Sequence, residues 1–190
     1  MLDRGKVVPA LIGRHQDFLV ITGLAGAVYE VSALTNNADY FYGLGGAMGA
    51  ACMMGLGLAL AQPTRRVLVV TGDGDLLMSL GSLCTIATLN PPNLSILCVD
   101  NGHYGETGYQ TSHTSRCVDL EAIARGAGIK LTHSVITEGD VAEGARLLRV
   151  GGDTSFVLAS VKPTDGPKGK LNLNGAMCRD IFRRALLGTP

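Results

Sequence analysis

The sequence predicts an α/β fold, a single domain built on a doubly wound parallel sheet. Short apolar runs rich in β-branched residues alternate with segments of helical periodicity, which is typical of βαβ units. Glycine and polar residues follow two of these runs, where a strand has to turn into a helix or a loop. A length of 190 residues is that of one domain, with a core large enough to fold alone.

The predicted elements have ordinary lengths and are separated by turn residues. Before a central unit at 66–109 we expect a helix within 1–16, a strand at 17–22, a turn at 23–26, a helix to 34 and an extended segment at 36–42. After it we expect a polar loop at 105–116, a helix at 119–127, a strand at 129–135, a helix at 140–150, a strand at 155–161, a linker at 163–174 and a helix at 176–187. Residues 1–190 are thus assigned to one domain, and 163–188 is its C-terminal linker and helix.

The composition excludes several classes of protein. The formal net charge is zero, which argues against electrostatic binding of nucleic acid or of an anionic membrane. The five cysteines include no CxxC pair and the four histidines are scattered, so neither a zinc site nor a disulfide framework is indicated. Reduced cysteines and the lack of a signal-peptide pattern predict a cytoplasmic protein.

One apolar stretch, residues 44–61, is long enough to be considered as a membrane span. It contains about 18 residues without a charge. Against this, it holds five glycines, starts with the loop-like Leu44-Gly45-Gly46, and has no second such stretch to accompany it. We therefore expect a buried helix whose small residues suit close approach at a subunit interface.

The chain is organised around 66–109, which has the pattern of one βαβ unit. A buried-type strand at 66–71 runs into Gly72-Asp73-Gly74, a helical pattern follows, and Pro91-Pro92 ends it before a strand at 94–99. The carboxyl ends of parallel strands form the ligand crevice of such folds. Glycines let the backbone approach a phosphate, and the helix N-terminus offers N–H groups to an anion. Asp73 and Asn101 add oxygen ligands of the kind that Mg²⁺ prefers.

Gly72-Asp73-Gly74, followed after 25 residues by Asp100-Asn101, resembles the signature of the thiamine diphosphate-dependent decarboxylase family. In that family the GDG aspartate, the second asparagine and the carbonyl two residues beyond it bind the metal. The resemblance assigns these roles to Asp73, Asn101 and the backbone of His103, and the implied metal is Mg²⁺. The family usually has asparagine where Asp100 stands, but that position is not the usual ligand. The alternative is a helix capped by Asp73 and an ordinary turn at Asn101-Gly102.

The resemblance also implies which residues surround thiamine diphosphate. Met48 would wedge between two rings of the cofactor and hold it bent; the alternative is that Met48 only fills the core. Backbone N–H groups after the metal ligands would close over the diphosphate, and the Glu106 side chain would repel it unless it points away, which leaves its role open; the alternative is a solvated loop. The turn at 23–26 lacks the hydroxyl that relatives place on the diphosphate, which leaves backbone N–H groups or Thr22. The implied cofactor-binding residues are Gly45, Gly46, Ala47, Met48, Gly72, Asp73, Gly74, Asp75, Asn101, His103, Tyr104, Gly105, Glu106 and Thr107.

The motifs are most similar to those of sulfopyruvate decarboxylase β subunits and the matching part of phosphonopyruvate decarboxylases. The implied reaction is non-oxidative decarboxylation of a three-carbon 2-oxo acid that carries a second anionic group, which the sequence leaves open as sulfonate, phosphonate or carboxylate. Gln110, His113 and Arg116 lie in a loop where such an anion could be bound, although a single histidine in a polar loop is more often incidental.

The family activates its cofactor with a glutamate that belongs to a separate pyrimidine-binding domain, and one domain of this size does not supply both. We therefore expect a two-chain enzyme in which a pyrimidine-binding α subunit supplies the glutamate, in a hetero-oligomer such as α2β2 or larger. Two alternatives stay open. One is a thiamine diphosphate enzyme of another class, an acetolactate-type carboligase or a 2-oxoacid:ferredoxin oxidoreductase β subunit, although the latter usually brings cluster-binding cysteines. The other is a non-catalytic protein that only binds thiamine diphosphate.

Overall fold

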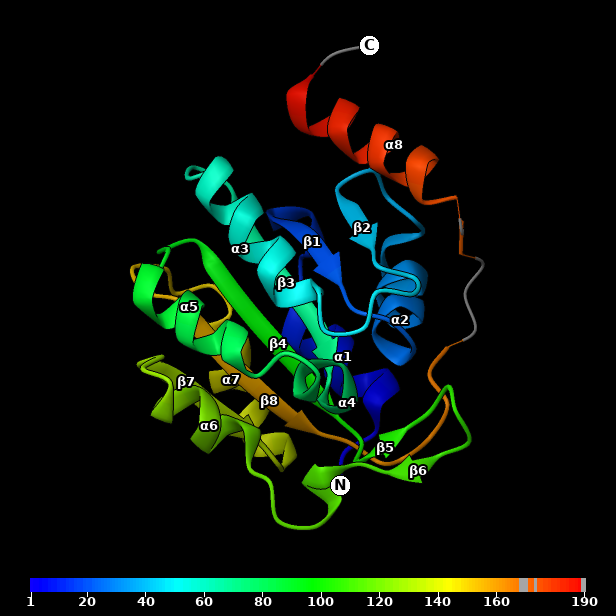
Figure 1. Ribbon diagram of the computed structural model, residues 1–190, viewed down its shortest axis with the longest axis vertical. Helices are drawn as coiled ribbons and strands as arrows, with labels where there is room; N and C mark the ends of the chain where they lie inside the picture. The colour runs from blue at the N-terminus through cyan, green and yellow to red at the C-terminus, as the bar shows by residue number, and fades with distance from the viewer. Residues whose placement is uncertain (168–170, 173, 189–190) are drawn as a thin grey trace.

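The described residues form a six-stranded sheet in which all neighbouring strands are parallel (Figure 1). A computed structural model describes residues 1–167, 171–172 and 174–188. The strand order reverses between β1 and β3, as the doubly wound prediction requires, which is therefore confirmed. In sheet order the strands are β2 (Phe41–Gly43), β1 (Phe18–Thr22), β3 (Arg66–Gly72), β4 (Leu94–Asp100), β8 (Ser155–Ser160) and β7 (Leu131–Val135).

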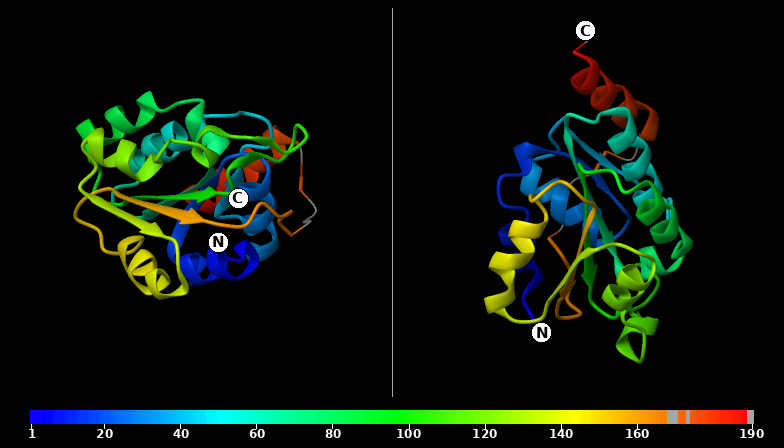
Figure 2. Two further views of the ribbon diagram at one scale, coloured as in Figure 1. Left: turned by 90° about the horizontal axis from the view of Figure 1, so that it is seen from below. Right: turned by 90° about the vertical axis from the view of Figure 1, so that its left-hand side faces the viewer.

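Helices cover both faces of this sheet and bury one core on each side (Figure 2). On one face lie α1 (Arg4–Ile12), α2 (Gly26–Thr35) and α7 (Val141–Leu147), and on the other α3 (Ala51–Ala61), α4 (Asp73–Leu77), α5 (Gly81–Leu89) and α6 (Leu120–Gly126). The two-residue period of a strand decides the division, since Val67 and Val69 of β3 join the α3 core while Leu68 and Val70 join the α1 core. All four side chains are fully buried, which explains the continuous apolar run in the sequence.

The central unit folds as predicted, with one difference in its helix. Instead of one helix after Gly72-Asp73-Gly74 there are two, α4 and α5, separated by Met78–Leu80. Asp119 caps α6 as predicted, because its carboxylate accepts the Ala122 N–H at 3.0 Å. Short 3-10 turns complete the described elements at η1 (His15–Asp17), η2 (His113–Ser115) and η3 (Glu138–Asp140).

The apolar stretch at 44–61 is only partly as predicted. Its helix, α3, begins at Ala51, and only one side of it is buried, so the expectation of a buried helix was wrong for the other side. Met53, Met54 and Leu60 are 39–52% exposed on that side. Among the described residues no helix is both long and apolar enough to cross a membrane.

The C-terminal segment runs back over the carboxyl edge of the sheet. After β8, Val161 forms an isolated parallel bridge with Leu2, and this brings the chain beyond it close to the N-terminal helix. The terminal helix α8 (Gly175–Leu187) then packs beside β2, with the Phe182 ring 5.9 Å from that of Tyr42 (Figure 1). The predicted linker at 163–174 lies in part outside the described residues.

Candidate functional site

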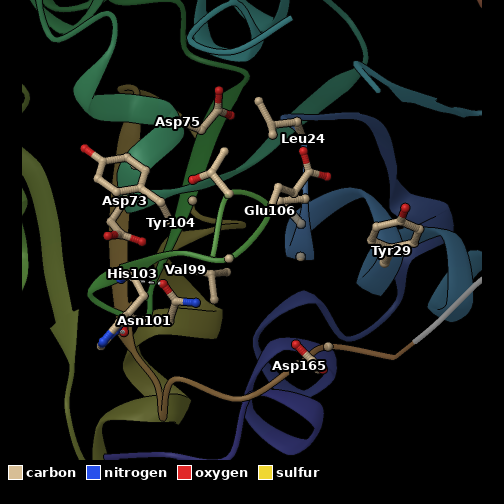
Figure 3. A pocket seen from close by; sticks show the side chains of 18 of the residues that line it. Leu24, Tyr29, Asp73, Asp75, Val99, Asn101, His103, Tyr104, Glu106 and Asp165 are labelled. Atoms are coloured by element: carbon tan, nitrogen blue, oxygen red, sulfur yellow. Dashed lines mark hydrogen bonds between the residues drawn. The ribbon is translucent and has the colours of Figure 1, made fainter. Parts of the chain in front are cut away.

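A cavity of about 610 Å³ opens at the carboxyl ends of β1, β3 and β4 (Figure 3). Its volume is that of a small-molecule site, and it lies at the topological switch point where doubly wound folds bind ligands. A hairpin forms one wall: its first strand, β5 (His103–Tyr104), precedes the polar loop predicted at 105–116, and its second strand, β6 (Gln110–Thr111), lies within that loop. The predicted residues that line the cavity are Gly46, Met48, Gly72, Asp73, Gly74, Asp75, Asn101, His103, Tyr104, Gly105, Glu106 and Thr107.

Several predicted residues do not line this cavity, and Thr22, one possible diphosphate contact, is fully buried. Gly45 and Ala47 line a second pocket, of about 390 Å³, between the loop before α3 and the terminal helix. Gln110 is used within the hairpin, where its Nε2 donates to the Thr107 carbonyl at 2.6 Å. His113 and Arg116 are exposed and do not line the cavity, so their contact with a substrate stays a prediction.

Two carboxylates meet at the ends of neighbouring strands. The register of β3 and β4 pairs Gly72 with Val99, so Asp73 and Asp100 follow side by side. Thr114 lies between them, donating from Oγ1 to Asp100 Oδ1 at 2.7 Å, with the same oxygen 3.2 Å from Asp73 Oδ2. Ser112, which is buried, also donates to Asp73 Oδ2. The sequence analysis missed both hydroxyls, although the run Thr111–Ser115 is visibly rich in them.

The electrostatics of this pair fit a bound cation. Burial raises the pKa of Asp73 and the negative charge of Asp100 raises it further, while the Ser112 hydrogen bond lowers it. In the described part of the chain no lysine or arginine forms an ion pair with either carboxylate. A buried carboxylate facing a second negative charge is unfavourable until a cation arrives. Mg²⁺ therefore suits the position that the sequence predicted for it.

The turn after β4 is shaped by its own hydrogen bonds. Asn101 Oδ1 accepts the His103 N–H at 2.9 Å, and the Gly102 N–H donates to Asp100 Oδ1 at 2.9 Å. Gly102 has φ +69°, and a side chain there would also press on Ser115 at 3.2 Å. This geometry holds the Asn101 amide and the His103 backbone near Asp73. Among the described residues no group of three His, Cys, Asp or Glu side chains could hold a metal, and the predicted ligand set, which has one carboxylate, one amide and one backbone carbonyl, does not require such a group.

The glycines of the GDG turn serve different purposes. A Cβ on Gly74 would lie 2.5 Å from the Tyr104 ring, so glycine is needed for the hairpin to pack against the turn. A Cβ on Gly72 would meet only the Val99 carbonyl, at 3.9 Å. Because Gly72 lines the cavity, this open side leaves room for a ligand to approach the backbone.

Asp75 connects the turn to two other loops. Its Oδ1 accepts the Gly49 N–H at 2.5 Å and its Oδ2 accepts the Thr71 hydroxyl at 2.7 Å. A Cβ on Gly23 would lie 1.7 Å from Oδ2, so the loop after β1 is held against the same carboxylate. Asp75 therefore fixes the positions of the cavity loops, and its predicted contact with the cofactor stays a prediction. Met48, one residue before Gly49, is 41% exposed on the cavity wall, which excludes the alternative of a core filler.

The family described as thiamine pyrophosphate enzyme, C-terminal TPP binding domain, matches residues 22–158. The chain belongs to this family. Thiamine pyrophosphate is the same molecule as thiamine diphosphate, so the predicted family, fold and cofactor are confirmed, and Mg²⁺ is the metal typical of such enzymes.

Proteins with similar sequences match most of the chain. The chain is 35% identical over 188 residues to the sulfopyruvate decarboxylase subunit beta of Methanothermobacter thermautotrophicus, covering 99% of this chain and 97% of that one. It is 49% identical over 128 residues to the subunit of the same name from Methanocaldococcus jannaschii, covering 67% and 66%. The solved Rhodococcus jostii thiamine diphosphate-dependent 4-hydroxybenzoylformate decarboxylase has the same fold, with TM-score 0.69 and 20% identity over 85% of this chain, but only 33% of that one.

Proposed function

We propose that this chain is the diphosphate-binding subunit of a two-chain thiamine diphosphate decarboxylase, acting on a three-carbon 2-oxo acid with a second anionic group. The observation that carries the proposal is the paired carboxylate site of Asp73 and Asp100, at the mouth of a cavity of cofactor size. The β subunit from M. thermautotrophicus supports it, since the two chains match over almost their full lengths and that protein is named for sulfopyruvate. A sulfonate is therefore the first anionic group to test.

The residues of this chain would bind and shape the cofactor. Asp73, the Asn101 amide and the His103 carbonyl would hold Mg²⁺, with Ser112 and Thr114 orienting the aspartate. When bound, thiamine diphosphate supplies the nucleophilic carbon and the electron sink that decarboxylation needs. Met48 would hold the cofactor bent, and the backbone of 104–107 would shield the diphosphate from water.

A partner chain is proposed because the carboxylates that line the described cavity either contact this chain's own groups or, in the case of Glu106, lie on an exposed loop. Asp75 accepts from Gly49 and Thr71, and Asp165 accepts the Tyr109 hydroxyl at 2.7 Å. Glu106 is exposed near the hairpin tip. The exposed apolar side of α3, with Met53, Met54 and Leu60, gives a partner a surface to cover. A pyrimidine-binding α subunit, in an α2β2 or larger assembly, would supply the missing glutamate.

Two expectations remain part of this proposal. A cytoplasmic location agrees with five cysteines that are all free. Catalysis, rather than cofactor binding alone, separates the decarboxylase from a non-catalytic binding protein, and the product formed separates it from a carboligase.

Native mass spectrometry of the protein purified gently from its own cells tests the proposal. A complex with a second chain of about domain size, carrying one thiamine diphosphate and one Mg²⁺ per pair, is the expected result. The complex is then supplied with sulfopyruvate, phosphonopyruvate and pyruvate, and CO₂ and the organic product are measured. An aldehyde product supports the decarboxylase, and acetolactate from pyruvate would indicate the carboligase. A homo-oligomer without second chain or cofactor would rule the proposal out.

A further inference from the structure

Arg4 is a buried cation in the cavity wall that the sequence analysis did not single out. It is the first residue of α1, is 6% exposed, and lines the cavity although it comes from an element outside every predicted motif. Its Nε donates to Glu30 Oε1 at 2.6 Å and its Nη1 to the Thr164 carbonyl at 3.1 Å. These two contacts fix the guanidinium in place between α2 and the C-terminal segment.

The third guanidinium nitrogen of Arg4, Nη2, lies beside Gly26 in the cavity wall. Within the described part of the chain Nη2 has no hydrogen-bond acceptor, and a Cβ built on Gly26 would lie only 2.2 Å from it. Gly26 begins α2, and no side chain caps the first N–H groups of that helix. Residues 24–27 line the cavity as well, so unpaired donors from the backbone and from Arg4 lie at one place in its wall.

The charges around the cavity make this cation distinctive. Of the described residues that line it, Arg4 is the one lysine or arginine, whereas four are carboxylates: Asp73, Asp75, Glu106 and Asp165. An anionic ligand would therefore meet repulsion over most of the wall, relieved by Mg²⁺ at Asp73 and by Arg4 at the head of α2. The strands that lead to these two places, β3 and β1, are neighbours in the sheet.

We propose that Arg4 binds the terminal phosphate of the cofactor diphosphate, through Nη2, together with the backbone N–H groups at the start of α2. The inference rests on the proposed function and adds a binding residue to it. An oxyanion such as a phosphate or a carboxylate is what a guanidinium edge and a helix N-terminus recognise together. The second anionic group of the substrate could be bound in the same way. The experiment therefore distinguishes the cofactor phosphate from the substrate anion as the ligand of Arg4.

Calorimetry on the protein as purified, with any partner it carries, compares thiamine diphosphate with thiamine monophosphate, both with Mg²⁺. Arg4→Gln is expected to weaken thiamine diphosphate binding by about 10- to 100-fold, as the loss of a charged hydrogen bond does. Binding of the monophosphate should change by less than about threefold, since the lost contact is to the second phosphate. Arg4→Lys keeps the positive charge but loses the planar guanidinium, so its affinity for thiamine diphosphate should lie between those of the unaltered protein and Arg4→Gln.

Two control variants separate binding from a structural role. Arg149 is another arginine that donates to backbone carbonyls, those of Leu11 and Ile12, but it does not line the cavity; Arg149→Gln should leave the preference for the diphosphate unchanged. Gly26→Ala retains both Arg4 and Glu30 but puts a methyl group against Nη2, so the guanidinium has to move away from the start of α2. It should reduce the same preference even if Arg4→Gln fails to fold.

Each other outcome has a definite meaning. Unchanged thiamine diphosphate affinity in the Arg4 and Gly26 variants, or an equal loss for both ligands, would overturn the inference. So would a raised KM for the 2-oxo acid with unchanged cofactor affinity, which would assign Arg4 to the substrate. If the unaltered protein bound no thiamine diphosphate, the proposed function itself would fail, and this inference with it.

Discussion

The hydroxyl of Ser112 donates a hydrogen bond to the carboxylate of Asp73, although 39 residues separate the two in the chain. Both are almost fully buried, so this contact, together with the longer one from Thr114, orients the carboxylate at the point where β3 ends. Partners of this kind fix the direction of a metal ligand and its charge. The residue that follows β6 therefore orients a predicted metal ligand, and the hairpin also forms a wall of the cavity.

Ser112→Ala should weaken Mg²⁺-dependent binding of thiamine diphosphate by about 10- to 100-fold, the usual effect of removing a group that orients a metal ligand. The Mg²⁺ concentration needed for half-maximal binding, followed by calorimetry, is the measurement. Ser115→Ala is the matched control, because its hydroxyl lies in the same turn but donates to the Ser112 carbonyl at 2.7 Å. Equal effects of the two substitutions would mean that the turn, and not the Asp73 contact, is what matters.

The central βαβ unit could be predicted because its signals are local. Two continuous apolar runs, a GDG turn and a prolyl stop each specify their own backbone, and parallel pairing then puts Asp73 and Asn101 at one edge. The family resemblance rested on the same residues. The prediction therefore required contacts only between neighbouring elements of one βαβ unit.

The remainder depended on long-range contacts that no local pattern encodes. Arg4 reaches the cavity because the segment after β8 returns beside Leu2 and offers the Thr164 carbonyl. Apolar residues on both sides of α3 predict that the whole helix is buried. In the single chain, however, one side of the helix is exposed. Asp75 was assigned to the cofactor from its place in the motif, while the structure uses both of its oxygens on neighbouring loops.

Asp73→Ala should abolish binding of Mg²⁺ and thiamine diphosphate while the protein still folds. The carboxylate is buried beside Asp100, and burial raises its pKa, so its removal relieves an unfavourable charge in the metal-free protein. Calorimetry and a urea unfolding curve are the two measurements. Undiminished affinity would remove Asp73 from the site, and a large loss of stability would show that it is structural instead.

Two glycines of α3 should respond oppositely to alanine. A Cβ on Gly55 would lie 2.1 Å from Val69 Cγ2, and β3 has no room to move, so Gly55→Ala should reduce the free energy of unfolding by about 1–3 kcal/mol. A Cβ on Gly57 meets nothing within 4 Å, so Gly57→Ala should raise it by about 0.5–1 kcal/mol through helix propensity. Urea unfolding of the isolated chain measures both, and the same sign for the two would contradict this packing of α3.

Part of the protein's stability should fall as pH rises above about 4.5, and Glu30 is one source of that fall beside Asp73, whose pKa burial also raises. Burial raises the pKa of Glu30 above the ordinary 4.5 of a glutamate, although Arg4, which faces it, lowers it in part. The folded state then holds a proton that the unfolded chain releases, so the free energy of unfolding declines from pH 4.5 up to the raised pKa and levels off above it. Glu30→Gln should remove the share of this decline that comes from Glu30 and leave the share that comes from Asp73. Thermal unfolding midpoints of both proteins across that range test it, and parallel curves would exclude Glu30 as the source.

Thiol reactivity should divide the cysteines by their position in the fold. Burial raises the pKa of the Cys52 thiol to about 12, with the charge of Asp75 adding to it, and burial likewise raises that of Cys98. Because the thiolate is the reacting form, neither should be alkylated by iodoacetamide at pH 8 in the folded chain. Cys84 and Cys117, which are exposed, should be modified readily, and all five should react in guanidinium chloride. Peptide mass spectrometry over time gives the rates. Labelling of Cys98 as fast as Cys84 would mean that the sheet between Asp73 and Asp100 opens in solution, and the buried metal site inferred from it would not hold.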